Sequence, residues 1–115
     1  MTQDEAMKFI DTKVKTTDLL MFMKGTPDFP MCGFSGRVVQ IFTHLGYKIE
    51  GVNVLDYDTI RNGVKTYSNW PTIPQIYIKG EFVGGCDIVV EMAESGELQK
   101  LLASKFPNQA AAPQG

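Results

Sequence analysis

The feature that most constrains the fold of this chain is an extended apolar segment followed by an amphipathic helix and a second extended segment. Residues 19–23 are uninterrupted apolar side chains, the pattern of a strand buried on both faces of a sheet. Apolar residues then recur at helical spacing from Phe34 to Leu45, and residues 49–54 alternate as a strand does. Because crossover connections are right-handed, we expect the two strands to run parallel with the helix between them.

The segments on either side of this unit add further helices and a hairpin. Residues 2–5 have the spacing of a capping box, which predicts a first helix of about four turns. Asp56 is the expected N-cap of a third helix and Asp87 that of a fourth, and a last helix follows. Residues 75–78 and 81–83 are predicted to pair as an antiparallel hairpin. This order implies an α/β fold in which helices cover both faces of a small mixed sheet of about four strands.

Length, charge and cysteine content limit the possible classes of protein. The 115 residues suit a single domain over residues 1–105, and residues 106–115 lack periodicity, which predicts a disordered tail. A net charge of -2 without a basic run gives no electrostatic basis for nucleic-acid binding. No apolar run approaches the roughly 20 residues that span a membrane. The acidic amino end and the two distant cysteines fit a reducing compartment, so we expect a cytoplasmic protein.

The motif Cys32-Gly33-Phe34-Ser35 carries the clearest chemistry. It has the layout of a dithiol redox motif in which a hydroxyl replaces the second thiol, so Ser35 supplies no resolving sulfur. Cys32 begins the second predicted helix, where the macrodipole and unpaired N–H groups lower the pKa of a thiol. A reactive thiolate is the prediction, and a buried, inert cysteine is the alternative.

Two residues near the ends of predicted strands are candidate ligand contacts. Lys24 ends the first strand, and its ammonium group can stabilise the thiolate or bind a carboxylate; a solvated surface charge is the alternative. Pro74 precedes a strand. A cis Ile73-Pro74 bond would leave the backbone N–H and C=O of Ile73 facing an extended peptide, and an ordinary trans bond is the alternative.

The turn Gly84-Gly85-Cys86-Asp87 joins the hairpin to the fourth helix. Its glycines permit close backbone approach, and the helix N–H groups at Cys86 and Asp87 suit a carboxylate. The alternative is a turn without function.

His44 is the single histidine and has no second candidate ligand near it, so we expect it on the surface.

Four sequence blocks together resemble the monothiol glutaredoxin family of the thioredoxin fold. They read MKGTP at residues 23–27, PMCGFS at 30–35, YSNWPTIPQ at 67–75 and GEFVGGCDI at 80–88. The resemblance implies a thioredoxin-like fold in which Cys32 is the active cysteine and Pro74 is a cis proline. It also implies a glutathione groove formed by Lys24, Arg61, the Ile73 backbone, Cys86 and Asp87.

The resemblance further implies an iron-sulfur function. A [2Fe-2S] cluster needs four thiolate-type ligands, and Cys32 from each of two chains with two glutathione molecules supplies them. Such a homodimer would bind its cluster loosely and deliver it to acceptor apoproteins. The resemblance also implies that a BolA-type protein can replace one protomer.

Two other functions remain open from the sequence. Cys32 can act as a glutathione-dependent thiol-disulfide oxidoreductase that removes glutathione from protein thiols, since this cycle needs no second protein cysteine. Alternatively, Cys32 and Cys86 can form a disulfide that serves as an oxidation sensor, provided that the fold brings the two sulfurs together.

Overall fold

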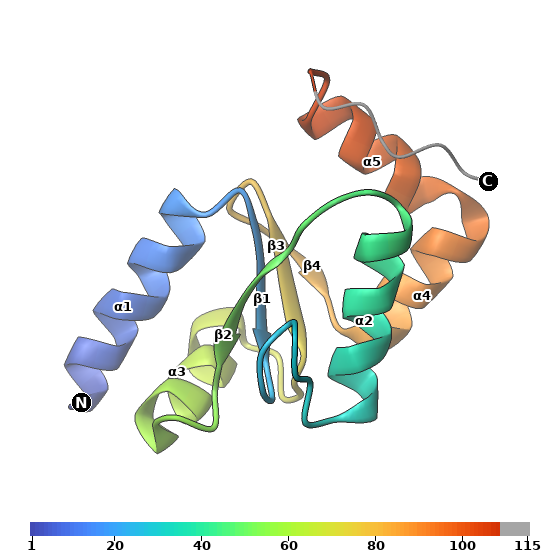
Figure 1. Cartoon of the computed structure of the whole chain (residues 1–115). Coiled ribbons are helices and arrows are strands. Elements are labelled where there is room, and N and C mark those ends of the chain that lie inside the picture. Colours follow the sequence, from blue (N-terminus) through green and yellow to red (C-terminus); the bar gives the residue numbers. More distant parts are fainter. Residues whose placement is uncertain (109–115) are drawn as a thin grey trace.

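In the computed structural model, which describes residues 1–108, a central sheet lies between two layers of helices (Figure 1). The strand order is β2-β1-β3-β4, in which β1 and β2 run parallel and the other neighbouring pairs run antiparallel. The predicted mixed sheet with helices on both faces is therefore confirmed. Within residues 1–108 the elements are α1 (Gln3–Thr16), β1 (Leu19–Met23), α2 (Gly33–His44), β2 (Glu50–Asn53), α3 (Asp58–Ser68), β3 (Gln75–Ile78), β4 (Glu81–Gly84), α4 (Cys86–Ser95) and α5 (Glu97–Lys105).

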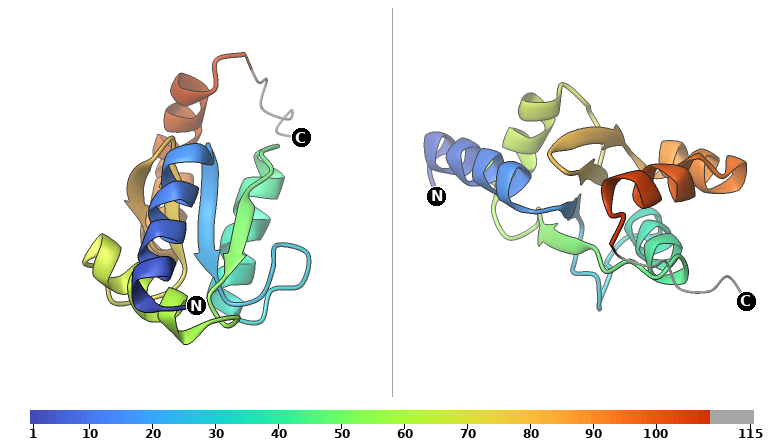
Figure 2. Two further views of the ribbon diagram at one scale, coloured as in Figure 1. Left: turned by 90° about the vertical axis from the view of Figure 1, so that its left-hand side faces the viewer. Right: turned by 90° about the horizontal axis from the view of Figure 1, so that it is seen from above.

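The central strand β1 is buried on both faces, as its uninterrupted apolar sequence predicts. Side chains alternate across a strand, so Leu19, Met21 and Met23 pack in the core under α2, α4 and α5. Leu20 and Phe22 pack in the second core, under α1 and α3. The two helical layers stand apart on opposite sides of the sheet when the molecule is viewed from above (Figure 2). Each fully buried side chain of this size contributes about 1.5–3 kcal/mol of hydrophobic stabilisation.

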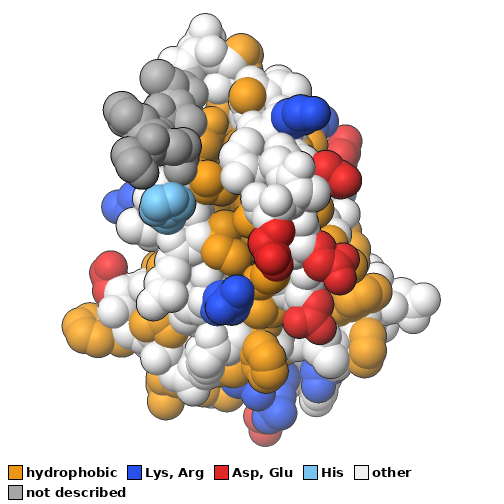
Figure 3. Space-filling model, turned by 90° about the vertical axis from the view of Figure 1, so that its right-hand side faces the viewer, with side chains coloured by type: hydrophobic (Ala, Val, Ile, Leu, Met, Phe, Trp, Pro, Cys, Tyr) orange, Lys and Arg blue, Asp and Glu red, His pale blue; other side chains and the backbone are white. Residues whose placement is uncertain are grey.

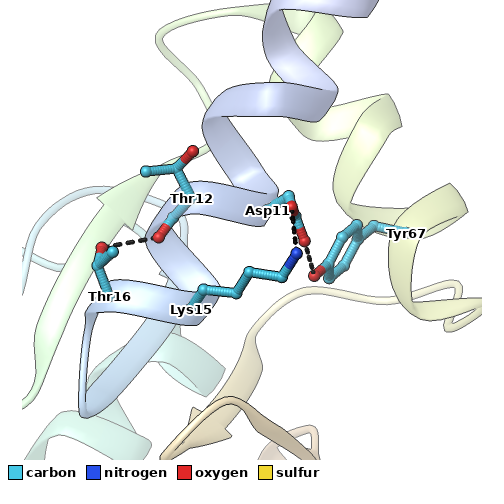
Figure 4. Close-up of polar contacts among 5 residues, drawn as sticks. All are labelled: Asp11, Thr12, Lys15, Thr16 and Tyr67. Atoms are coloured by element: carbon cyan, nitrogen blue, oxygen red, sulfur yellow. Dashed lines mark hydrogen bonds and ion pairs between the residues drawn. The ribbon is translucent and has the colours of Figure 1, made fainter.

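A polar contact fastens α1 to α3 on one face of the sheet (Figure 4). The Tyr67 hydroxyl on α3 donates a hydrogen bond of 2.7 Å to Asp11 Oδ1, and Lys15 Nζ lies 2.8 Å from Asp11 Oδ2. Burial, followed by the adjacent carboxylate, raises the pKa of Tyr67 to about 12. The predicted capping box of Thr2 and Glu5 begins α1. The hydrogen bond between Tyr67 and Asp11 therefore joins the two helices that cover this face of the sheet.

Two predicted helix caps are wrong. The N-cap of α3 is Tyr57, which makes no capping hydrogen bond through its side chain, while the Asp56 carboxylate accepts a 3.4 Å contact from Asn53 Nδ2. The turn after β2 thus uses Asp56 before the helix begins. The N-cap of α4 is Gly85, and Asp87 is the second residue of the helix. Here the helix follows β4 directly, so no side-chain cap intervenes.

The carboxyl-terminal boundary also differs from the prediction. Phe106, assigned by sequence to the disordered tail, packs its ring 5.9 Å from the Tyr47 ring. Lys79 Nζ lies 4.9 Å from the centre of the same ring, and the Phe106 N–H donates to the Leu102 carbonyl. The rest of the predicted tail falls mainly at residues 109–115, outside the described residues. Among residues 1–108, no helix is long and apolar enough to cross a membrane.

The sheet brings three chain segments to one of its edges. Because β1 and β3 run antiparallel with Phe22 opposite Gln75, the carboxyl end of β1 meets the start of β3. Gly84 at the end of β4 lies opposite Ile76 of β3, and α4 begins immediately after it. The loop before α2, the loop before β3 and the start of α4 therefore converge.

Candidate functional site

Cys32 occupies the N-cap position of α2, as the sequence predicts. Its backbone is extended, with φ -149° and ψ 136°, and its side chain makes no capping hydrogen bond. The thiol pKa is nevertheless lowered, chiefly by the Ser35 backbone N–H, then by the Phe34 N–H and the Lys24 charge, against partial burial, which raises it. A thiolate at this position is stabilised by the helix end and by a nearby cation.

Ser35 is a buried link between α2 and β1. Its side chain is 0% exposed, and its hydroxyl accepts a hydrogen bond of 3.3 Å from the Lys24 backbone N–H. The hydroxyl also makes the smallest of the contributions that lower the pKa of Cys32. The residue that replaces a second thiol thus has a structural role, and its burial keeps it from acting as an external nucleophile.

The loop between β1 and α2 is a closed turn that carries Lys24 toward Cys32. The Met31 N–H donates to the Lys24 carbonyl at 2.9 Å, and Thr26 and Phe29 exchange backbone hydrogen bonds of 3.2 Å and 3.0 Å. Gly25 has a φ of +89°, and a Cβ atom there would lie 2.5 Å from the Phe29 carbonyl oxygen. Glycine is therefore required where this loop turns.

A groove runs along the loop before β3 and the start of α4, and we call it the cis-proline groove. Cys32 is outside its lining and lies two residues before Phe34, which lines it. The Ile73-Pro74 peptide bond is cis, the geometry expected from the sequence. A Cβ atom on Gly85 would lie 3.2 Å from the Pro74 carbonyl oxygen, so glycine permits the close approach of the two segments. The groove encloses about 220 Å³ and is lined by Phe34, Trp70, Thr72, Ile73, Pro74, Gly85, Cys86, Asp87 and Ile88.

The structure brings most of the predicted ligand contacts together, but not all. Ile73, Cys86 and Asp87 line the cis-proline groove, and Gly84 is buried at the end of β4 beside it. Lys24 lies outside the lining and is connected to the site through its charge on Cys32. Arg61 is exposed on α3 and is likewise outside the lining. His44 is exposed, as expected.

Cys86 is the second thiol of the site, and its environment is apolar. It is 8% exposed. Burial raises the pKa of its thiol, and the Asp87 carboxylate and Cys32 raise it further, while Arg37 lowers it. Both cysteines are free thiols, and each lies at the amino end of a helix.

The surface around Cys32 is unusually apolar. Phe29, Met31 and Phe34 are 78%, 69% and 62% exposed. Figure 3 shows hydrophobic side chains over much of the face formed by α2, α4 and α5, including its lower end, where α2 begins. Large exposed apolar groups in one place mark interaction surfaces. A protein partner would therefore bury them beside the thiol.

Comparisons with known proteins agree with this geometry. The glutaredoxin family model matches residues 19–83. A probable monothiol glutaredoxin 2 of Rickettsia typhi is 48% identical over 102 residues, which cover 89% of this chain and 92% of that protein. The chain belongs to the monothiol glutaredoxins.

Solved glutaredoxin structures have the same fold. The solution structure of reduced poplar apo GrxS14 superposes with a TM-score of 0.80 at 50% identity, covering 92% of this glutaredoxin and 98% of that chain. The crystal structure of a buckwheat glutaredoxin-glutathione complex superposes with a TM-score of 0.79 at 25% identity, covering 90% and 92%. The predicted thioredoxin-like fold is confirmed.

Sequence reasoning missed one buried polar residue that shapes the groove of this glutaredoxin. Gln75 is 0% exposed, and its Nε2 donates to the carbonyls of Trp70 at 3.0 Å and Thr72 at 3.3 Å. These bonds hold the loop that leads to Pro74. The available signal was a glutamine at the start of an otherwise apolar strand, since a buried polar side chain needs hydrogen-bond partners.

The glutaredoxin chain on its own has few metal ligands. Among residues 1–108 no group of three or more His, Cys, Asp and Glu side chains could hold a metal ion. Cys32 is one accessible thiol with a lowered pKa, a suitable ligand for iron. The donor set therefore fits a cluster only if further ligands come from outside this chain.

Proposed function

We propose that this glutaredoxin binds glutathione and carries a [2Fe-2S] cluster between two chains for delivery to acceptor apoproteins. The observation that carries the proposal is the placement of Cys32, whose thiol pKa is lowered, two residues before Phe34, which lines the cis-proline groove. One chain offers one such ligand, and the cluster needs four. Cys32 from two chains and two glutathione thiolates complete the set.

Glutathione is an extended tripeptide with two carboxylates, and the cis-proline groove suits it. The Ile73 backbone can pair with the peptide, and the N–H groups at the start of α4, at Cys86 and Asp87, suit a carboxylate. Lys24 and Arg61 would supply cations at the margins of the groove. The buckwheat glutaredoxin of the same fold is described in complex with glutathione, which supports this assignment.

A homodimer follows from the ligand count. Phe29, Met31 and Phe34 lie within three residues of Cys32 in the sequence and are exposed, so a second copy that brings its own Cys32 close would bury them. A BolA-type protein that offers a metal ligand and an apolar surface would take the place of one copy. Because half of the ligands are diffusible, the cluster is cargo that an acceptor can remove.

The chain's own residues prepare the thiol for this role. Ser35, Phe34 and Lys24 lower the pKa of Cys32, which favours the thiolate form that binds iron. The groove orients glutathione with its sulfur near Cys32, and the apolar surface around Cys32 excludes water once a partner binds. We further propose a cytoplasmic location, because both cysteines are free, as a reducing compartment requires.

The lowered pKa of Cys32 also supports a second candidate, a glutathione-dependent oxidoreductase. The Cys32 thiolate attacks the glutathione sulfur of a protein-glutathione disulfide, and the protein thiolate leaves. A second glutathione thiolate then attacks the glutathione sulfur bound to Cys32, which releases the Cys32 thiolate and glutathione disulfide. The cycle regenerates the Cys32 thiolate and needs no second protein cysteine.

The presence of two free cysteines, each at the amino end of a helix, supports a third candidate, the oxidation sensor. A Cys32–Cys86 disulfide needs a two-electron oxidant such as glutathione disulfide, which would be reduced to two glutathione thiols. The buried Cys86 thiol, with its raised pKa, would be the slower nucleophile. The sensor therefore depends on Cys32 reacting first and Cys86 resolving the mixed disulfide.

Anaerobic reconstitution with iron, sulfide and glutathione tests the carrier proposal. Absorption spectroscopy and gel filtration should show a coloured dimer that transfers its cluster to an apoferredoxin. A colourless monomer would refute the carrier, and fast glutathione-dependent reduction of a small mixed disulfide would establish the oxidoreductase instead. The Cys86→Ser variant is the control, since it removes the sensor and keeps the cluster ligand.

A further inference from the structure

Asn53 joins two loops at the edge of the sheet, outside the cis-proline groove. It is the last residue of β2 and pairs with Met23 of β1. Its Oδ1 atom accepts hydrogen bonds of 3.0 Å from the backbone N–H of Gly25 and 3.0 Å from that of Leu55. One side-chain oxygen therefore ties the loop after β2 to the loop that carries Lys24.

Contacts from three elements fix the backbone around Lys24. The Lys24 N–H donates to Ser35 Oγ on α2 at 3.3 Å, and the Lys24 carbonyl accepts from Met31 at 2.9 Å. The next N–H along the chain, that of Gly25, is the one that Asn53 accepts. Because these three backbone groups each have a partner, the position from which the Lys24 side chain extends is well determined.

We infer that Asn53 is a positioning residue that places the Lys24 ammonium group for a glutathione carboxylate. The inference rests on the proposed function, which assigns Lys24 to glutathione. Without the Asn53 oxygen, the Gly25 N–H loses its partner, and the Lys24 backbone keeps only its bonds to Ser35 and Met31. The Lys24 side chain then samples more positions, and restricting it to one of them on binding costs conformational entropy, which weakens glutathione binding.

A double-mutant cycle tests this role by calorimetric titration with glutathione. Asn53→Ala should weaken glutathione binding roughly five-fold, the effect of one lost hydrogen bond, and Lys24→Ala should weaken it more. The double variant should bind no more weakly than Lys24→Ala, because Asn53 acts through Lys24. Additive losses would overturn the inference, since they would mean that Asn53 supports the site in another way.

Two controls separate positioning from general destabilisation. Asp56→Ala removes the 3.4 Å contact with Asn53 Nδ2 but leaves Gly25 bonded, so it should leave glutathione affinity unchanged. Glutathione diethyl ester has both carboxylates masked, and its binding should be the same in Asn53→Ala and wild type. If the ester loses affinity in step with glutathione, Asn53 does not act through the carboxylate contact.

The outcomes distinguish this inference from the proposed function. A wild-type chain that fails to bind glutathione refutes the proposed function, whereas normal binding by Asn53→Ala refutes the inference alone. If Asn53→Ala does not fold, the milder Asn53→Ser variant is titrated in its place. Amide hydrogen exchange in the wild type gives a further check, because a Gly25 N–H that exchanges as fast as in an unstructured peptide would contradict the contact with Asn53.

Discussion

Cys32 and Cys86 lie at the amino ends of two helices, yet their thiols are shifted in opposite directions. Cys32 is the N-cap of α2 and is half-buried, and its pKa is lowered by the Ser35 and Phe34 N–H groups and by Lys24. Cys86 is the first residue of α4 and is buried, and its pKa is raised by burial and by Asp87. A helix amino end alone therefore does not make a thiol reactive.

The difference lies in which groups face the sulfur. At the N-cap, a side chain is directed at the free N–H groups of the first turn, and β1 delivers a lysine to the same place. At Cys86 the cost of removing a thiolate from water exceeds the benefit of the helix end. Cys32 is therefore suited to act as a nucleophile or metal ligand, whereas Cys86 is a protonated residue of the groove.

Replacing each cysteine by serine should give the largest contrast. Cys32→Ser should abolish cluster assembly and any glutathione-dependent turnover, because the remaining thiol is buried and protonated. Cys86→Ser should retain both, with at most a few-fold loss from the altered groove. The measurements are the absorption spectrum after anaerobic reconstitution and turnover of a mixed disulfide. Equal losses in the two variants would show that the thiols do not have separate roles.

Alkylation of the wild-type protein by iodoacetamide at neutral pH should separate the two thiols next. Cys32 should react roughly ten-fold faster or more, because it has the larger thiolate fraction and the greater exposure. Its rate should reach half of its maximum at a lower pH than that of Cys86, since its pKa is lowered and that of Cys86 is raised. Peptide mass spectrometry over a pH series measures both. Denatured protein, in which the rates should converge, is the control.

Lys24→Gln should reduce the difference in alkylation rate between Cys32 and Cys86 without removing it. It removes the positive charge that favours the thiolate, so the pKa of Cys32 should rise, while the larger contribution of the Ser35 N–H remains. We expect a loss of a few-fold in the alkylation rate of Cys32 below its pKa. Lys48→Gln, an exposed lysine after α2, is a matched control that should leave the rate unchanged.

Features of the site that depend on neighbouring residues could be predicted from the sequence, whereas those that depend on contacts between distant segments could not. The bounds of β1 and the cap position of Cys32 follow from apolar runs and loop residues, which are local signals. The buried roles of Ser35 and Gln75 depend on which groups the fold brings against them, so neither could be distinguished from an ordinary polar residue. The predicted caps at Asp56 and Asp87 were wrong because Asp56 belongs to the turn after β2, and Gly85, directly after β4, takes the cap position of α4.

The smallest expected effect is the change in the pKa of Cys86 when a neighbouring charge is removed. One substitution should lower this pKa and another should raise it. Asp87 raises the pKa of this thiol and Arg37 lowers it, so Asp87→Asn should lower the pKa and Arg37→Gln should raise it. Both side chains are exposed, and solvent screening limits each change to about two-fold in alkylation rate. The measurement uses a Cys32→Ser background, in which Cys86 is the single thiol and its rate can be followed against pH. Shifts in the same direction would mean that the substitutions act by exposing Cys86 to solvent, because added exposure would lower its pKa in both variants whatever charge was removed.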